Sequence, residues 1–247
     1  ASLSKPVFAY AVLKLCEQGL LDLDTPLVHY WPEPPCADPR TARITARHVL
    51  SHTTGFPSWR DEDEAGSGQL RLLANPGITF CYSGEGFQYL QQVIEHLTQQ
   101  PLHTLIKTHL FTPVGMNDST FAWAIPGPTI TLDENNNPVP VIDEEGNIVG
   151  EGPYLMANAA YSLLTTAYDY GKFLLTMLNP VPNDPVRLNI TSVAAMLTPQ
   201  VQVGTHANLQ WGLGWGIQQT AAGAISWHWG GQNDYFNYVA FLPHQRK

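Results

Sequence analysis

The chain has 247 residues, of which 44% are hydrophobic and 13% are charged, and its net charge is −9 from 12 basic and 21 acidic residues. This length provides the core of one large domain or of two intertwined ones. Four acids lie in residues 61–64 and six in residues 133–151. The sequence shows no basic face for nucleic acid and no apolar run long enough to span a bilayer.

The first predicted element is a helix over residues 2–18. Phe8, Val12 and Leu15 recur in it at helical intervals, and Gly19 ends it. Apolar stripes in later segments predict further helices. These cover residues 44–51, a segment that begins near residue 84 and keeps its stripe to residue 97, residues 102–110 and residues 166–178.

Residues 126–153 differ from the rest because they combine three consecutive asparagines with a cluster of acids. We expect them to form a loop or a short hairpin outside the core. After the last helix, short aromatic and β-branched segments bounded by turn residues predict consecutive antiparallel strands. These strands cover residues 211–219, 224–229 and 235–242.

Helices followed by strands indicate an α+β fold, in which an antiparallel sheet packs against the first helix and the 166–178 helix. We expect a catalytic α/β region made of residues 1–35 and 156–247. A mostly helical insert would span residues 36–155. A functional site would lie between the two.

Ser2 and Lys5 open the first helix, three residues apart, so their side chains share one face. A hydroxyl beside an amine is a minimal arrangement for nucleophilic catalysis, because a neutral lysine can take the serine proton. The pair alone is a weak signal. Ser2 can equally be a helix cap, and Lys5 a surface lysine.

Two further segments carry candidate groups at the ends of elements, where functional residues concentrate. Tyr82 precedes Ser83 and Gly84 at a helix start, and His228 is followed by Trp229, Gly230 and Gly231 at a strand end. Tyr82 can also be a core aromatic residue, and His228 a purely structural hydrogen-bonding group.

No metal site or cofactor is predicted. His48 and His52 are spaced like a pair of metal ligands, but the glutamate that accompanies such a pair in metalloproteases is missing. The three cysteines, Cys16, Cys36 and Cys81, lie far apart and indicate neither a disulfide framework nor a zinc site.

Taken in order, these elements resemble the S-x-x-K, Y-x-N and K/H-x-G motifs of the serine β-lactamase and penicillin-binding-protein superfamily, in its class C branch. That branch includes class C β-lactamases, D-stereospecific peptidases and family VIII carboxylesterases. Segments 44–55, 111–116 and 211–215 resemble it too. The resemblance therefore covers nearly the whole chain.

The resemblance implies a role for each matching residue. Ser2 would be the acylated nucleophile, and either Lys5 or Tyr82 would be the base that activates it. The backbone N–H groups of Ser2 and Gly231 would form an oxyanion hole, a contribution of about 3–4 kcal/mol per donor. His228 would line the site, and the substrate pocket would include Gly84, Trp229 and Gly230.

Two departures from the motifs bear on the substrate. Gly84 replaces the family's Asn, which usually contacts the amide of a β-lactam or peptide. His228 with Trp229 replaces Lys-Thr, and a mostly neutral imidazole attracts a substrate carboxylate poorly. Both changes favour simple esters.

A third departure concerns the ends, because only Ala1 precedes Ser2 and little follows Leu242. No signal peptide or initiator methionine is present, so we expect a chain trimmed from a longer precursor, with its compartment left open. The sheet would be small, with an exposed edge. Either the sequence is a fragment, or a homodimer partner covers that edge, or the protein manages with a reduced sheet.

The sequence thus predicts a serine hydrolase that cleaves short-chain carboxylic esters through an acyl-enzyme, without a cofactor. One alternative is a β-lactamase, a D-alanyl-D-alanine carboxypeptidase or a D-aminopeptidase. Another is a catalytically silent binding protein of the same fold. The expected partner is a small-molecule ester or amide, with no nucleic acid and no membrane span.

Overall fold

A computed structural model of the chain describes residues 1–60, 69–121, 123–124, 141–142, 148–150, 155–232 and 235–243. The helices are α1 (Ser4–Glu17), α2 (Ala46–Leu50), α3 (Gly84–Thr98), α4 (Leu102–Ile106), α5 (Thr112–Val114), α6 (Ala167–Leu178) and α7 (Ile190–Met196), with 3₁₀ turns η1 (Leu27–His29) and η2 (Pro39–Arg43) and a π-helical turn η4 (Lys107–Phe111). The strands are β1 (Trp123–Ala124), β2 (Val141–Ile142), β3 (Ile148–Gly150), β4 (Leu155–Met156), β5 (Val201–Gln202), β6 (Leu209–Trp211), β7 (Gly216–Thr220), β8 (Gly223–Gln232) and β9 (Tyr235–Phe241).

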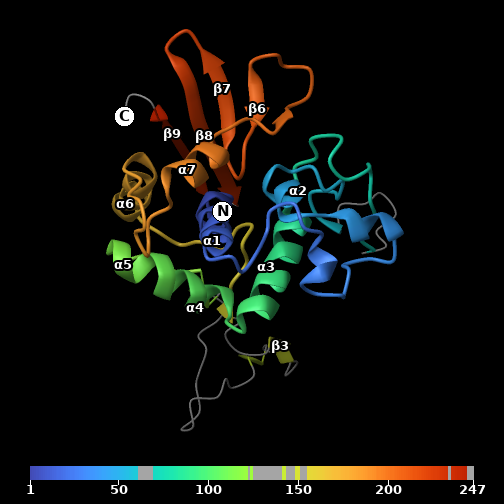
Figure 1. Cartoon of the computed structure of the whole chain (residues 1–247). Helices are drawn as coiled ribbons and strands as arrows, with labels where there is room; N and C mark the ends of the chain where they lie inside the picture. Colours follow the sequence, from blue (N-terminus) through green and yellow to red (C-terminus); the bar gives the residue numbers. More distant parts are fainter. Residues whose placement is uncertain are drawn as a thin grey trace.

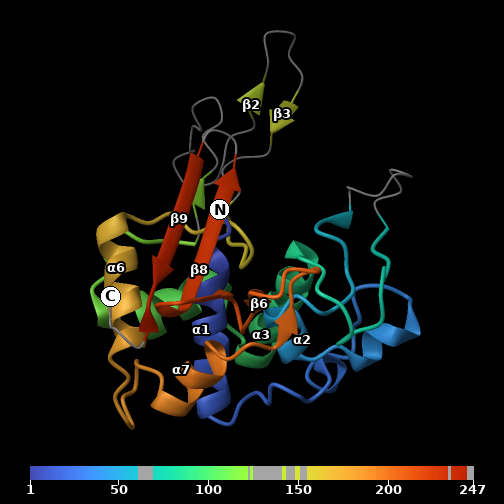
Figure 2. The same ribbon diagram turned by 90° about the horizontal axis from the view of Figure 1, so that it is seen from above.

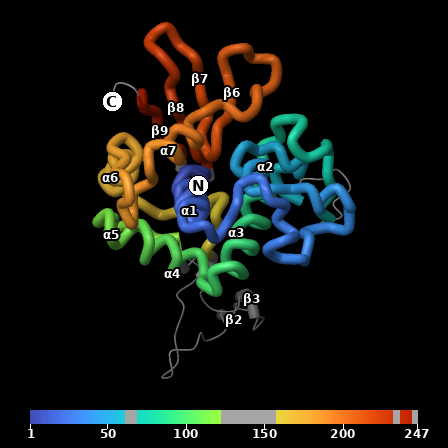
Figure 3. The backbone as a smooth tube through the Cα atoms, viewed as in Figure 1, coloured from blue at the N-terminus to red at the C-terminus, as the bar shows by residue number. Residues whose placement is uncertain are grey.

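The predicted α+β architecture is confirmed. Strands β5 to β9 form an antiparallel sheet in sequence order, and α1 lies against it in the middle of the molecule, with α6 on one side and α3 on the other (Figures 1 and 2). Helices α4 and α5 lie on the side of α1 away from the sheet (Figure 3). The fold is thus layered as sheet, central helix and outer helices.

Helix α1 is buried on nearly all sides, because eleven of its fourteen residues are buried. It begins at Ser4 rather than at the predicted residue 2, with Leu3 in the capping position. The first turn is nevertheless anchored. Tyr170 donates its hydroxyl to Leu3 O at 3.1 Å, and Leu163 donates its N–H to the Ser4 hydroxyl at 2.9 Å.

The predicted strand over residues 211–219 is two strands. β6 ends at Trp211 and β7 begins at Gly216, and these two residues pair across the ladder. Gly214, in the turn between them, has a φ of +86°, a conformation that glycine adopts without the strain of a Cβ atom. A Cβ there would also lie 2.7 Å from the Ala9 Cβ atom of α1, so the turn packs closely on the central helix.

Strand β8 carries the sheet toward the start of α1. It pairs with β7 only as far as Trp227, whereas its pairing with β9 continues to Gln232. A Cβ atom on Gly230 would lie 2.7 Å from the backbone nitrogen of Ser2. The second half of β8 thus touches the first residues of the chain with its glycine backbone.

Most predicted helices are confirmed, with local differences. Ser83 caps α3 by accepting the Gly86 N–H, and Thr166 caps α6 by accepting the Asp169 N–H. The predicted 102–110 helix continues as the π-helical turn η4. In the 126–153 excursion, the described residues pair as the hairpin β2–β3. The rest of that excursion and the acidic residues 61–64 lie outside the described residues.

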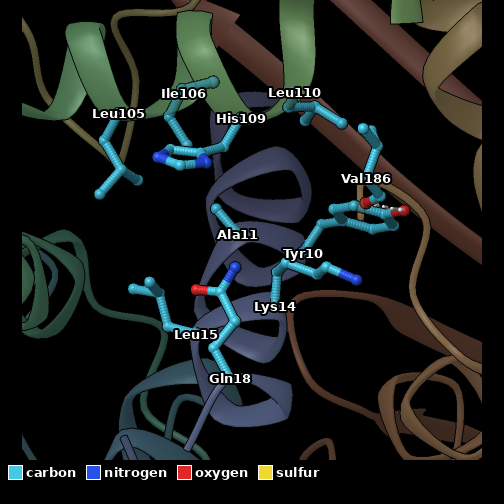
Figure 4. A pocket seen from close by; sticks show the side chains of 10 residues that line it. All are labelled: Tyr10, Ala11, Lys14, Leu15, Gln18, Leu105, Ile106, His109, Leu110 and Val186. Atoms are coloured by element: carbon cyan, nitrogen blue, oxygen red, sulfur yellow. Dashed lines mark hydrogen bonds between the residues drawn. The ribbon is translucent and has the colours of Figure 1, made fainter. Parts of the chain in front are cut away.

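A small apolar cavity of about 20 Å³ lies between the second half of α1 and the α4–η4 segment. Figure 4 shows its lining, with Leu105, Ile106 and Leu110 on one side and Ala11 and Leu15 on the other. It shares no lining residue with the candidate site described below.

Candidate active site

The Ser2 hydroxyl and the Lys5 amine are within hydrogen-bonding distance. Lys5 Nζ donates to Ser2 Oγ at 3.0 Å and to the carbonyl oxygen of Ala160 at 2.8 Å. Ala160 lies 155 residues further along the chain, so no local pattern predicted this contact. The hydrogen bond to the Ala160 carbonyl holds the Lys5 amine in an orientation that keeps it next to the Ser2 hydroxyl.

Lys5 is almost completely buried, with 2% of its surface exposed. Its Nζ lies 4.7 Å from the ring centroid of Tyr82 and 5.6 Å from that of Phe87. Burial disfavours the charged ammonium and lowers the pKa of Lys5 to about 7. A substantial fraction of the amine is therefore neutral, and able to accept a proton, near neutral pH.

Tyr82 lies directly before the capping residue of α3 and adjoins the same hydroxyl. Burial raises the pKa of the Tyr82 phenol well above its usual range, and a side-chain hydrogen bond with Ser2 opposes that rise only in part. The phenol is thus protonated at neutral pH, a state in which it can donate a hydrogen bond.

His52 supports Tyr82 and was not predicted as a site residue. Its ring stacks on the Tyr82 ring with centroids 4.2 Å apart. Its Nδ1 accepts the Ser83 N–H at 3.0 Å, and its carbonyl oxygen accepts the Cys81 N–H at 2.7 Å. His52 therefore holds the backbone on both sides of Tyr82.

In the sequence, His52 stood out only because its spacing from His48 is that of a pair of metal ligands. The two rings make different contacts in the structure. His48 Nδ1 accepts the Thr45 N–H at the start of α2, whereas His52 contacts Tyr82 and its neighbours. Among the residues that the structure describes, no group of three or more His, Cys, Asp or Glu side chains is placed to hold a metal ion.

His228 lies in the interior, 1% exposed, on the face of β8 that packs toward α1. Its Nδ1 is 2.7 Å from the Trp229 carbonyl oxygen, so the proton is on Nδ1 because a carbonyl only accepts. Burial, with a smaller repulsion from Lys5, lowers the pKa of His228 to about 3. The imidazole is neutral at physiological pH.

Ser2 and Lys5 open onto a pocket of about 340 Å³. Its lining also includes Tyr82, Gly84 and Gly231 among the predicted site residues, and Ala1, Ser58, Trp59, Ala160 and Tyr161, which the sequence did not single out. The pocket brings together the beginning of α1, the start of α3, the edge of β8 and the segment before α6.

Trp229, which the sequence predicted in the substrate pocket, does not line it. Its side chain is 56% exposed and lines a groove with Leu209, Trp227 and Tyr238. Successive residues of a strand point to opposite faces, so Trp229 points away from the buried His228. Gly230, on the same face of β8 as His228, lies against the backbone of Ser2.

The comparison with known families agrees with this geometry, since the family model described as Beta-lactamase matches residues 1–247. The chain belongs to the Beta-lactamase family. The predicted resemblance to the β-lactamase and penicillin-binding-protein superfamily is thereby confirmed. Within the described residues, no helix has the length and apolar character needed to cross a membrane.

Similar curated proteins in this family carry different names. The chain is 33% identical to esterase EstB of Burkholderia gladioli over 172 residues, which cover 59% of this chain and 44% of EstB. It is 26% identical to penicillin-binding protein 4 of Amycolatopsis lactamdurans over 269 residues, which cover 98% of this chain and 68% of that protein. Against EstB, the match thus spans less than half of the relative's length.

Among solved structures, a D-stereospecific amidohydrolase from Streptomyces sp. superposes on the chain with a TM-score of 0.74 at 20% identity. The superposition covers 100% of this chain and 78% of that one. At this identity the likeness supports the Beta-lactamase fold alone.

Proposed function

We propose that this Beta-lactamase family member is a serine hydrolase that cleaves short-chain carboxylic esters through an acyl-enzyme at Ser2. The observation that carries the proposal is the 3.0 Å separation between Lys5 Nζ and Ser2 Oγ, beside a pocket that could hold a small ester. The name of the similar protein EstB supports the choice of esters.

In the first step, neutral Lys5 takes the proton of the Ser2 hydroxyl while Oγ attacks the ester carbonyl carbon. The structure favours Lys5 over Tyr82 as this base. Burial lowers the pKa of Lys5 to about 7, whereas it raises the pKa of the Tyr82 phenol. A base needs a pKa near the working pH, and only the amine meets that condition.

The tetrahedral intermediate places a negative charge on the former carbonyl oxygen. The N–H groups of Ser2 and Gly231 would stabilise that charge. The close approach of Gly230 to the Ser2 nitrogen brings the two backbones together, and β7 does not pair with this part of β8. Glycine at position 230 is what permits the approach.

Collapse of the intermediate releases the alcohol, which takes a proton from Lys5 or from the Tyr82 phenol, and leaves the acyl group on Ser2. Water then attacks the acyl carbon and gives a proton to the same pair. The carboxylic acid leaves, and the Ser2 hydroxyl is restored. His228 takes no part in these proton transfers because its pKa lies far below neutral, at about 3.

Two features favour esters over β-lactams and peptides. Gly84 offers no side chain to a substrate amide, and His228 carries no charge to attract a substrate carboxylate. β-Lactamase or D-peptidase activity remains the alternative reaction, and a silent binding protein the alternative class.

The test has two parts. A fluorophosphonate probe should label the folded protein at Ser2, as located by mass spectrometry, and the Ser2→Ala variant should stay unlabelled. The protein should also hydrolyse p-nitrophenyl acetate faster than a chromogenic cephalosporin. Absence of labelling would favour the silent protein, and the reverse ranking of substrates would favour the β-lactamase.

The division into a catalytic region and a 36–155 insert stays a prediction, as does the homodimer that covers the sheet edge. Strand β9 is the outer strand on one side of the sheet. Static light scattering should give twice the monomer mass, and a monomer at every concentration would contradict the dimer.

A further inference from the structure

Trp59 lies against the start of α3, where Gly84 has no side chain. A Cβ atom on Gly84 would lie 2.2 Å from Cζ2 and 2.4 Å from Cη2 of the Trp59 indole. The φ of Gly84 is not positive, so the backbone would accept an L-residue with a side chain. Position 84 therefore has to be glycine because the Trp59 indole occupies the space that a side chain at this position would need.

The backbone on both sides of Trp59 is bonded to the first residues of α3. Ser58 O accepts the N–H groups of Gly84 at 2.9 Å and Glu85 at 3.3 Å. Arg60 donates its N–H to Glu85 Oε1 at 3.0 Å, and its guanidinium donates to both carboxylate oxygens at 2.9 and 2.7 Å. Glu85 is only 3% exposed, so its charge-assisted bonds to Arg60 hold firmly the backbone next to Trp59.

The indole lines the pocket that contains the nucleophile. Trp59 and Tyr161 are both among its lining residues, and their rings meet edge to face with centroids 5.7 Å apart and planes at 75°. An aromatic wall favours flat apolar groups through dispersion and ring electrostatics. Its ring face provides neither the donor nor the acceptor that a substrate amide needs.

We propose, on the basis of the function proposed above, that Trp59 is the specificity-determining residue of this site. It selects esters whose acyl group ends in a flat apolar ring, and it excludes from position 84 any side chain that could bind an amide. The acyl group is the part concerned, because it becomes bonded to Ser2 in the first step and stays there, next to the pocket wall, until water releases it in the second.

The first test compares p-nitrophenyl phenylacetate with p-nitrophenyl acetate, which share a leaving group. In Trp59→Ala the ratio of the two kcat/KM values should fall about tenfold, and Trp59→Phe should retain part of it. Tyr168→Ala is the matched control, since Tyr168 is 76% exposed on α6, and its ratio should equal that of the wild type. An unchanged ratio in Trp59→Ala overturns the proposal.

A second series keeps the acetyl group and changes the alcohol from p-nitrophenol to a small aliphatic alcohol. The effect of Trp59→Ala on this ratio should be small, because the alcohol is expected on the other side of the carbonyl. A larger effect here than in the acyl series would overturn the assignment of Trp59 to the acyl group.

A pair of variants tests whether the Trp59 indole and a side chain at position 84 compete for the same space. Gly84→Asn alone should lower the melting temperature and the rate of Ser2 labelling, because Asn Cβ would overlap the indole. The double variant Trp59→Ala/Gly84→Asn should recover both, and its ratio of p-nitroanilide to p-nitrophenyl ester hydrolysis should exceed that of Trp59→Ala. A double variant no more stable than Gly84→Asn contradicts this competition for space.

Labelling of Ser2 distinguishes failure of this inference from failure of the proposed function. If the wild-type protein is labelled at Ser2 and hydrolyses esters, but its acyl preference does not depend on Trp59, only this inference is wrong. If the folded wild-type protein is not labelled at Ser2, the proposed function is wrong, and the inference that rests on it is wrong too.

Discussion

Lys5 has lost nearly all the water that normally surrounds a lysine ammonium, and the surroundings that replace it are mostly apolar. The rings of Tyr82 and Phe87 lie near its amine, and the Ala160 carbonyl and the Ser2 hydroxyl accept its hydrogen bonds. Within the part of the chain that the structure describes, no carboxylate forms an ion pair with the Lys5 amine, and burial alone lowers its pKa. The amine is therefore easier to deprotonate than a surface lysine.

The first prediction concerns pH. With a neutral ester, kcat/KM should be low in acid, where Lys5 is protonated and cannot act as a base, and should rise to a plateau above its pKa of about 7. Neither His228, with a pKa of about 3, nor His52, whose pKa burial keeps well below its usual range, titrates there. Initial rates from about pH 5 to 9 measure the profile. A rate independent of pH over this range would contradict the assignment to Lys5.

The second prediction concerns His52, a positioning residue for Tyr82. Its φ of +55° is a conformation that Asn tolerates, so His52→Asn should fold but lose the stacked ring. We expect kcat to fall about tenfold, KM to change little and the pH profile to keep its rise near 7, because Tyr82 moves and Lys5 does not. His29→Asn, at an exposed histidine, is the control, and equal kcat values for the two variants would argue against the role.

At the scale of elements, the site depends on how closely α1 and β8 approach. Strand β8 contributes glycine backbone to this contact, since Gly230 touches the Ser2 nitrogen and Gly231 lines the pocket. Beyond Trp227, the edge of β8 on the side of β7 has no partner strand, because the β7 pairing stops at that residue. Under the proposed function, a substrate would lie beside this edge.

The third prediction follows from that approach. Gly230→Ala would put a Cβ atom 2.7 Å from Ser2 N and 3.0 Å from the Ala1 Cβ. We expect ester hydrolysis and fluorophosphonate labelling to fall at least about a hundredfold, because the predicted oxyanion hole is displaced. Circular dichroism should still show a folded protein.

A matched glycine provides the control. Gly171 lies inside α6, and a Cβ atom there would meet no atom within 4 Å. Gly171→Ala should leave activity unchanged and stabilise the protein by about 0.5–1 kcal/mol. Equal activities for the two variants would show that the contact between Gly230 and Ser2 does not matter.

Helix periodicity and turn residues made much of the architecture predictable. The apolar stripes after Gly84 and within residues 166–178 predicted α3 and α6, and the aromatic segments near the C-terminus predicted the main strands. Helix α7, with seven residues, is too short for a clear period and was missed. The turn at Gly214 was missed because the apolar residues on both sides of it read as one strand.

The candidate site was predictable where chemistry and motif coincide, as in Ser2, Lys5 and Tyr82. It was not predictable where residues far apart in the sequence meet only because the folded backbone brings them together. Ala160 acts through a carbonyl that every residue has, and Trp59 is known to fill the space at Gly84 only once the two are placed together. Trp229 was assigned to the pocket because the orientation of its strand was unknown.

At the scale of the whole molecule, α1 joins the two predicted regions through one core. Phe8 contacts Phe87 of α3, with ring centroids 6.0 Å apart, and Tyr10 contacts Phe173 of α6 at 5.5 Å. The same helix carries Lys5, so the packing that stabilises the fold also places the amine. Neither region can open without exposing one side of this helix.

The last prediction is therefore that the protein unfolds as one unit. Phe8 is completely buried, so Phe8→Ala should lower the free energy of unfolding by about 3–5 kcal/mol, whereas Tyr168→Ala on the exposed face of α6 should change it by less than about 0.5 kcal/mol. In urea, far-ultraviolet circular dichroism, tryptophan fluorescence and ester hydrolysis should share one midpoint in each variant. Separate midpoints for the helical signal and the activity would mean that the 36–155 region unfolds independently, and that α1 does not couple it to the sheet.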